Sequence, residues 1–244
     1  FYSSLFSLVC IVGLITIQGD GDKFLRAIKT DWKRSIILGA INPFIYYLIL
    51  FQAYDMLPAQ EAQALNYTWA LTMTLLAVPI LKQKLRAQDA VAAVLCYSGV
   101  LFIATRGNPL GLDFANIEGV VWALLSTLLW AVYWLVNTRD NRPPVIGLGL
   151  NFLMSLIFSF IYCLINMEWQ FPAWQGLAGA AYIGFFEMGI TFVLWLSAMK
   201  LTDSTAKIAN LIFLSPLLSL FFISTFLGEK IFPSTLVGLG LILG

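Results

Sequence analysis

Apolar residues fill nine long runs of the chain, and short polar stretches separate them. A helix that crosses a bilayer needs about 20 predominantly apolar residues. The pattern therefore predicts nine membrane-spanning helices, over residues 1–17, 35–54, 59–81, 88–105, 117–137, 145–166, 174–199, 204–227 and 232–244. The connections are brief, so no stretch is expected to form a separate soluble domain.

Composition supports this prediction, because 60% of the residues are hydrophobic and only 11% are charged. Soluble globular proteins carry about 25% charged residues. The expected fold class is an all-α, polytopic transmembrane helix bundle. The net charge of +1 offers no field that would attract nucleic acid. Histidine is absent and the three cysteines lie far apart, so we expect neither a metal site nor a cofactor.

Lysine and arginine predict the orientation of the helices. Loops after the first, third, fifth and seventh segments contain eleven basic residues, and loops after the even segments contain two, if Lys207 inside a segment is left out. Basic loops stay in the cytoplasm. The odd loops are therefore predicted to be cytoplasmic and the even loops to lie outside.

Two groups of three segments share the same order of spans and loops. Their loops read KQKL at 82–85 and GEKI at 228–231, which are 146 residues apart. An odd number of spans separates the groups, so the repeats are inverted, as in many secondary carriers. We expect a ten-helix parent with two inverted five-helix repeats, of which nine segments are visible: the first helix is missing and the last is truncated. Residues 1–105 are the first repeat (helices 2–5 of the parent), 106–116 connect, and 117–244 are the second repeat (helices 6–10).

The chain resembles the drug/metabolite transporter superfamily, in particular its EamA-type ten-helix members. The resemblance rests on residues 53–76, and on residues 197–244 with a short polar turn, a span containing Pro216, a Gly-Glu pair and a glycine-rich last span. LNYTWA at 65–70 is similar to the bacterial aromatic-amino-acid exporters, although Ala70 stands where proline commonly follows the tryptophan. The resemblance implies a carrier of small solutes.

Glu187 is the only carboxylate deep inside a predicted span. An ionised carboxylate without a partner is unfavourable at this depth, so either a cation or substrate amine approaches it or it holds a proton. A carboxyl group that only packs within the bundle is the alternative. In the next span, Lys207 and Asn210 are candidates for the carboxylate of a substrate, while Lys207 can also extend to the cytoplasmic interface.

Other polar residues inside the spans are candidates for a substrate pathway, because polar groups in a membrane face the bundle interior or a wet cavity. Pro43 and Pro216 are predicted helix kinks. Glu61 lies near a helix end, where water can solvate it. An aromatic stripe that includes Trp130 can also be helix packing, and glycines such as Gly147, Gly149, Gly238, Gly240 and Gly244 allow close helix contacts. The substrate-binding candidates are Asn42, Tyr46, Asn66, Trp130, Glu187, Lys207 and Asn210, and Glu187 is also the proton-coupling candidate.

These observations predict a secondary transporter in the bacterial cytoplasmic membrane. It is expected to export small polar or amphipathic metabolites, amino acids first among them, by alternating access with a central site between the repeats. It is expected to function as a monomer, with protons as a candidate coupling ion. An exporter of hydrophobic amines or drug-like cations is the alternative cargo class. An intramembrane enzyme is more distant, because a nucleophile–base pair and a second deep carboxylate are missing. A channel would need a polar ring that the sequence does not show.

Overall fold

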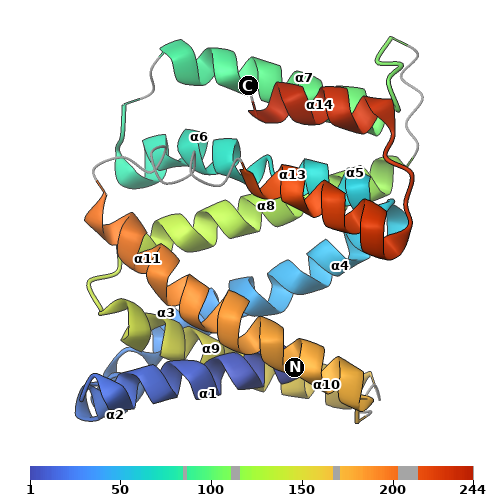
Figure 1. Ribbon diagram of the computed structural model, residues 1–244. Helices are drawn as coiled ribbons and strands as arrows, with labels where there is room; N and C mark the ends of the chain where they lie inside the picture. The colour runs from blue at the N-terminus through green and yellow to red at the C-terminus, as the bar shows by residue number, and fades with distance from the viewer. Residues whose placement is uncertain (85–86, 111–115, 167–170, 203–213, 244) are drawn as a thin grey trace. The chain divides into compact units, whose positions relative to one another are not determined.

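The computed structural model describes residues 1–84, 87–110, 116–166, 171–202 and 214–243 (Figure 1). Every regular element in these ranges is helical, and three stretches, η1, η2 and η4, are π-helical. The elements are α1 (Tyr2–Ile17), α2 (Gly21–Thr30), α3 (Trp32–Gly39), η1 (Ala40–Ile45), α4 (Tyr46–Met56), α5 (Ala59–Asn66), α6 (Trp69–Leu81), α7 (Ala87–Ala104), α8 (Ile117–Thr138), α9 (Pro144–Ile165), α10 (Trp174–Tyr182), η2 (Ile183–Thr191), α11 (Phe192–Leu201), α13 (Leu214–Phe222), η4 (Ile223–Leu227) and α14 (Pro233–Leu243).

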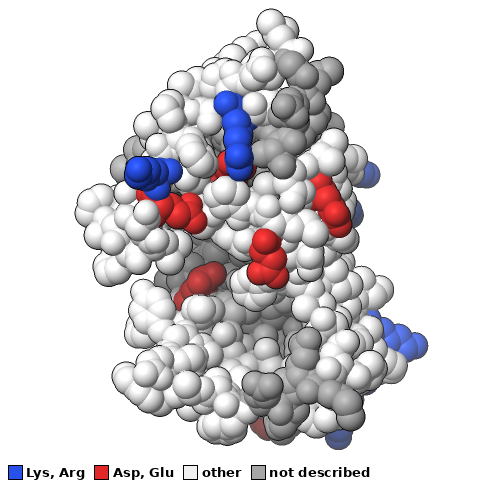
Figure 2. Space-filling view, turned by 90° about the vertical axis from the view of Figure 1, so that its right-hand side faces the viewer, with Lys and Arg blue, Asp and Glu red and all other residues white. Residues whose placement is uncertain are grey.

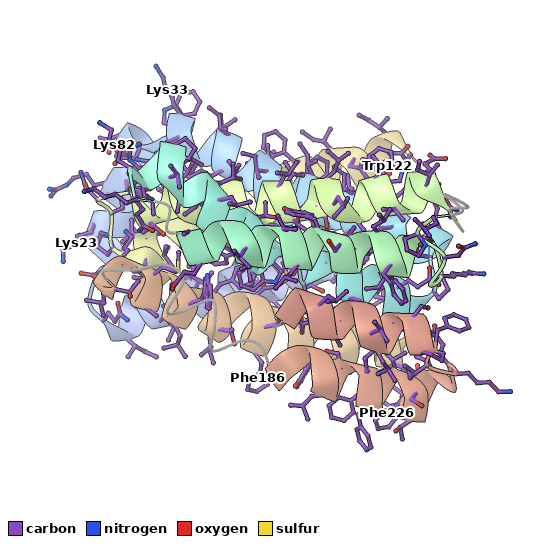
Figure 3. All side chains as sticks on the ribbon, turned by 90° about the horizontal axis from the view of Figure 1, so that it is seen from above. Lys23, Lys33, Lys82, Trp122, Phe186 and Phe226 are labelled. Atoms are coloured by element: carbon purple, nitrogen blue, oxygen red, sulfur yellow. The ribbon has the colours of Figure 1, made fainter. Side chains whose placement is uncertain are left out.

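Five continuous helical stretches are long and apolar enough to cross a membrane. They are Trp32–Met56, Ala59–Leu81, Ile117–Thr138, Pro144–Ile165 and Trp174–Leu201. Large apolar side chains lie on the surface, including Phe186 at 57% and Phe226 at 77% exposure, and both point away from the ribbon (Figure 3). Exposed apolar side chains of this kind fit lipid rather than water, as the all-α membrane fold class predicts. Figure 2 looks onto one set of helix ends, where several acidic and basic side chains are visible.

Helix α2 is an element that the search for apolar runs does not find. It is short and amphipathic: Ala27 is buried, whereas Lys23, Arg26 and Lys29 are exposed. Its Phe24 packs on α9, where a Cβ on Gly149 would lie 2.9 Å from the Phe24 ring. The helix is too polar to cross a membrane, so its apolar face is stabilised by packing on the helix bundle.

The chain divides into two compact units. Unit 1 contains Phe1–Tyr46 and Val136–Leu201, and unit 2 contains Tyr47–Leu135 and Thr202–Gly244. Each unit therefore contains helices from both predicted repeats. The first repeat, for example, supplies α1 to η1 to unit 1 and nearly all of α4 to α7 to unit 2. The predicted repeats and the packed units thus divide the chain at different residues.

Close backbone contacts hold the helices of each unit together. In unit 1, α3 approaches α9 so closely that a Cβ on Gly39 would lie 2.4 Å from the carbonyl oxygen of Asn151. In unit 2, a Cβ on Gly238 of α14 would lie 2.3 Å from Ile103 of α7. Not every predicted contact forms. Gly149 and Gly238 are tightly packed, but Gly240 faces open space and Gly147 has only ordinary contacts, while Gly244 lies outside the described residues.

Contacts between loops agree with the predicted alternation of the spans. In unit 1, Arg34, Asp140 and Lys200 meet, and all three belong to ends predicted to be cytoplasmic. In unit 2, the α5 N-terminus, Arg106 and Glu229 meet, and all belong to ends predicted to lie outside. A miscounted span would have placed partners such as these at opposite membrane faces.

The internal repeat also has a backbone counterpart. Lys82 ends α6 with a φ of 58°, and Gly228 ends η4 with a φ of 68°. These positions are 146 residues apart, so the offset taken from the loop sequences superposes two left-handed helix ends. Glycine adopts this conformation readily, whereas lysine does so at a steric cost.

Candidate functional site

Of the three π-helical stretches in the described residues, η1 and η2 lie at corresponding positions of the predicted repeats, and both lie in unit 1. The first, η1, is Ala40–Ile45, and residues 186–191, at the 146-residue offset, fall inside η2, Ile183–Thr191. Interrupted spans at matching positions of two halves are a good indication of a carrier's binding site. π-Helical turns are also frequent at functional sites. We therefore take η1 and η2 as the candidate functional site.

The interruption in η1 is located at Asn42, whose φ of −146° and ψ of 127° are extended rather than helical. Proline follows it, and a residue before proline is pushed out of the α region by steric contact with the ring. Pro43 also lacks the N–H that would continue the helical hydrogen bonds. The span thus leaves backbone groups near its middle without regular helical partners, because Asn42 is ten residues, or roughly 15 Å, into the helical stretch that starts at Trp32.

The side chain of Asn42 is fully buried, and neither its amide nitrogen nor its amide oxygen has a hydrogen-bond partner among the described residues. The Ser155 hydroxyl of α9 is also fully buried and has no hydrogen-bond partner within the described ranges. Gly39 packs on Ser155, and the ring of Phe44 lies 5.9 Å from that of Phe158, so Asn42 lies between two contacts of η1 and its neighbours with α9. A buried polar group without a partner costs about 1–3 kcal/mol. A polar ligand or water would remove that cost.

The η2 stretch carries Glu187 and packs on α1. A Cβ on Gly184 would lie 2.5 Å from Phe6, and the Cys10 thiol contacts the carbonyl oxygen of Phe185 at 3.7 Å. Glu187 itself is exposed on unit 1. It is 13 residues into the 28-residue stretch Trp174–Leu201, which is about 20 Å at 1.5 Å per residue and thus near the middle of the span.

The structure places the predicted site residues in separate groups. Asn42, buried Tyr46 and Glu187 lie in unit 1, whereas Asn66 and Trp130 lie in unit 2. Asn66 donates a 3.0 Å hydrogen bond to Ser126, so its amide is partly used within the bundle. Lys207 and Asn210 lie outside the described residues, and Pro216 lies in the first turn of α13.

Trp130 belongs to an aromatic cluster. Its ring centroid is 6.2 Å from that of Trp69 and 5.6 Å from that of Trp134, in edge-to-face contacts. Trp134 and Trp69 are buried, and Trp130 is partly exposed. The cluster supports helix packing, and its exposed edge leaves Trp130 as a candidate for contact with a ring-bearing cargo.

The prediction that water solvates Glu61 is wrong. Its side chain is 2% exposed and pairs with Arg106, with 3.3 Å between Oε1 and Nε. The loop at 228–232 covers this end of α5: Glu229 accepts hydrogen bonds from the backbone N–H groups of Ala59 and Gln60 at 3.2 and 3.4 Å. Glu229 of the Gly-Glu pair thus caps a helix that is about 170 residues away in the sequence.

A buried charge cluster in unit 1 was missed by the sequence interpretation. Arg142 donates to the Asp140 carboxylate at 2.8 Å and to the Ser35 hydroxyl at 2.8 Å, and Lys200 donates to the backbone oxygens of residues 140 and 142. Burial by itself would raise the pKa of Asp140, but the hydrogen bonds from Arg142 and the charges of Arg142 and Arg34 outweigh it and lower the pKa. The signal was present as RDNR at 139–142, a carboxylate between two arginines in a tight loop.

Comparison with known proteins agrees with this architecture. The sequence profile of the EamA-like transporter family matches residues 1–105 and 117–244. The chain belongs to the EamA-like transporter family. Members of this family are integral membrane transporters, so the intramembrane enzyme is not retained as an alternative.

Individual relatives are more distant. The chain is 25% identical over 187 residues to the aromatic amino acid exporter YddG of Ancylobacter novellus, covering 76% of this chain and 64% of that protein. It is 27% identical over 236 residues to protein PecM of Dickeya dadantii, covering 93% of this chain and 75% of the relative. A solved crystal structure matches with a TM-score of 0.73 at 20% identity, over 100% of this chain and 84% of the other, which supports the fold.

Proposed function

We propose that this protein is a secondary transporter that exports small amphipathic metabolites, amino acids first among them, by alternating access. Membership of a transporter family supports the class, and a relative named as an aromatic amino acid exporter supports the cargo. The observation that carries the proposal is the pair of π-helical stretches, η1 and η2, at corresponding positions of the two predicted repeats.

In the proposed mechanism, Asn42 and Glu187 serve different parts of the cargo. The Asn42 amide offers both a donor and an acceptor and has no partner among the described residues, so it can bind a carboxylate or an amine. Glu187 is an anion near the middle of its span, so a cargo ammonium group or a proton neutralises it. When cargo or a proton binds at either residue, the free-energy cost of holding that polar side chain in the membrane falls. Release of the cargo or proton restores this cost.

Two further properties complete the proposal. Glu187 couples transport to protons, and one chain suffices for transport, because both repeats that build an inverted pair come from the same polypeptide. A hydrophobic amine or drug-like cation is the runner-up cargo, since its charge would also neutralise Glu187.

The test is transport in proteoliposomes of the full protein, with labelled L-phenylalanine and labelled phenethylamine as cargoes at several pH values. Glu187→Gln is expected to slow amino acid movement and to abolish its pH dependence. Glu118→Gln is the matched control, because Glu118 is an exposed carboxylate at the start of α8 and contacts only its neighbour Trp122 among the described residues.

Each outcome decides a part of the proposal. If Glu187→Gln transports like the unmodified protein at every pH, Glu187 is not a proton site. Movement of phenethylamine without movement of any amino acid would favour the amine-exporter alternative.

A further inference from the structure

Unit 2 contains a hollow of about 350 Å³ between the end of α7 and the start of α14, two helices that lie side by side in Figure 1. Phe102, Phe232 and Val237 give it apolar walls, and Arg106 is the charged side chain among the described residues that line it. Small-molecule sites have volumes from about 300 Å³ upward and combine apolar walls with a few polar groups. The hollow has this size and this composition.

The backbone holds Arg106 at the mouth of the hollow in an unusual conformation. Its φ is 49°, and the N–H groups of Arg106 and Gly107 donate to the carbonyl oxygens of Ile103 and Phe102 at 3.0 and 2.9 Å. This is the Schellman pattern of a helix end, in which the left-handed position is usually glycine. Arginine occupies it at a steric cost.

The guanidinium of Arg106 contacts both the Glu61 carboxylate and the ring of Phe232, and only Phe232 of these two lines the hollow among the described residues. Its Nε pairs with Glu61 at 3.3 Å, and its central carbon lies 5.7 Å from the ring centroid of Phe232. A guanidinium has five N–H donors in a planar fork, so the pair with Glu61 leaves donors for a second anion. The Arg106 side chain is 54% exposed, which makes these donors accessible from outside.

We propose that this hollow is a subsite for small aromatic carboxylates at the predicted outer end of unit 2. The ring of the ligand lies between Phe102 and Phe232, and its carboxylate binds the guanidinium of Arg106. The inference rests on the proposed function, because a transporter that exports ring-bearing amino acids releases such carboxylates at this side. It adds a residue, Arg106, that neither the repeat nor the interrupted spans identify.

The test is equilibrium binding of 3-phenylpropionate to the purified full chain, with 3-phenylpropionamide as the uncharged comparison. The amide is expected to bind roughly tenfold or more weakly, since it loses a hydrogen bond between two charged groups. Arg106→Gln alone leaves Glu61 buried without its partner, so the paired variant Glu61→Gln/Arg106→Gln is measured as well. Both variants are expected to lose the preference for the carboxylate.

Lys230→Gln is the matched control, because it removes an exposed cation of the same predicted end that does not line the hollow. Among the described residues, Lys230 forms a hydrogen bond only through its backbone oxygen, which accepts from the Gln60 side chain, so the control should bind like the unmodified protein. Equal affinity for carboxylate and amide, or full affinity in the paired variant, would overturn the subsite. If phosphatidylglycerol vesicles displace bound 3-phenylpropionate but other free aromatic carboxylates do not, the hollow binds a lipid headgroup. That result would also overturn the proposed subsite.

Binding and transport separate this inference from the proposed function. Arg106-dependent binding in a protein that moves no amino acid would retain the subsite and reject the exporter. Transport of amino acids without Arg106-dependent binding would retain the exporter and reject the subsite.

Discussion

The contact between α7 and α14 makes a sharp prediction about a single methyl group. A Cβ on Gly238 would lie 2.3 Å from Cγ1 of Ile103 and 2.8 Å from the carbonyl oxygen of Gly99. Ile103 is 1% exposed, so its side chain has no open space to enter. Gly238→Ala must therefore push α7 and α14 apart or force Ile103 from its rotamer, and overpacking of this kind costs about 1–3 kcal/mol.

Gly240→Ala on the same helix provides the matched control. A Cβ on Gly240 meets no atom within 4 Å. Both substitutions gain the same intrinsic helix propensity, roughly 0.5–1 kcal/mol relative to glycine. The difference between the two variants therefore isolates the steric term, and Gly238→Ala should be less stable than Gly240→Ala by about 1–3 kcal/mol.

The measurement is the free energy of unfolding in mixed micelles, followed by far-UV circular dichroism as the fraction of SDS increases. Ile103→Ala removes a buried side chain and should itself be destabilising. Its combination with Gly238→Ala should cost less than the sum of the two single losses, because two of the three closest atoms belong to Ile103. The packing of α7 on α14 described here is refuted if both glycine variants unfold alike, or if the losses of Gly238→Ala and Ile103→Ala simply add.

Three further predictions follow from single positions. Lys82→Gly should stabilise the protein by about 1 kcal/mol in the same unfolding assay, because it relieves a left-handed lysine; a loss of stability would contradict this. Asp140→Asn should cost about 3 kcal/mol at neutral pH, with exposed Asp22→Asn as the control. The folded-state pKa of Asp140 is lowered, so its contribution is present above the ordinary aspartate pKa and is lost as the pH falls toward the lower folded value; a variant that shows the same acid-induced loss as the unmodified protein would reject it. Asn42→Leu should leave unfolding unchanged or more difficult but should reduce proteoliposome transport, because the amide has no partner among the described residues; undiminished transport would exclude it from the site.

Several features of the candidate site could be read from the sequence. Asn42–Pro43 indicates a break because proline removes a donor and restricts the residue before it. Glu187 stands out because a carboxylate in the middle of an apolar run has no water around it. Such signals are local, so they need no knowledge of neighbours.

Other features depend on partners that are distant in the sequence. Glu61 lies close to a helix end and looks solvated, yet Arg106 and the loop with Glu229 bury it. Helix α2 escapes a search for long apolar runs, since only one of its faces packs on the bundle. The equivalence of η1 and η2 needs both the 146-residue offset and the backbone geometry.

The sequence by itself determined the membrane class, and it predicted the spans and the alternation of their ends. These inferences rest on residue-by-residue transfer into lipid and on the charge of each loop, which are additive along the chain. Only the tertiary structure decided which glycines touch a neighbouring helix, which buried amide has no partner among the described residues and which arginine lines a hollow. Such properties depend on distances between segments up to about 170 residues apart, and hydrophobicity does not encode those distances.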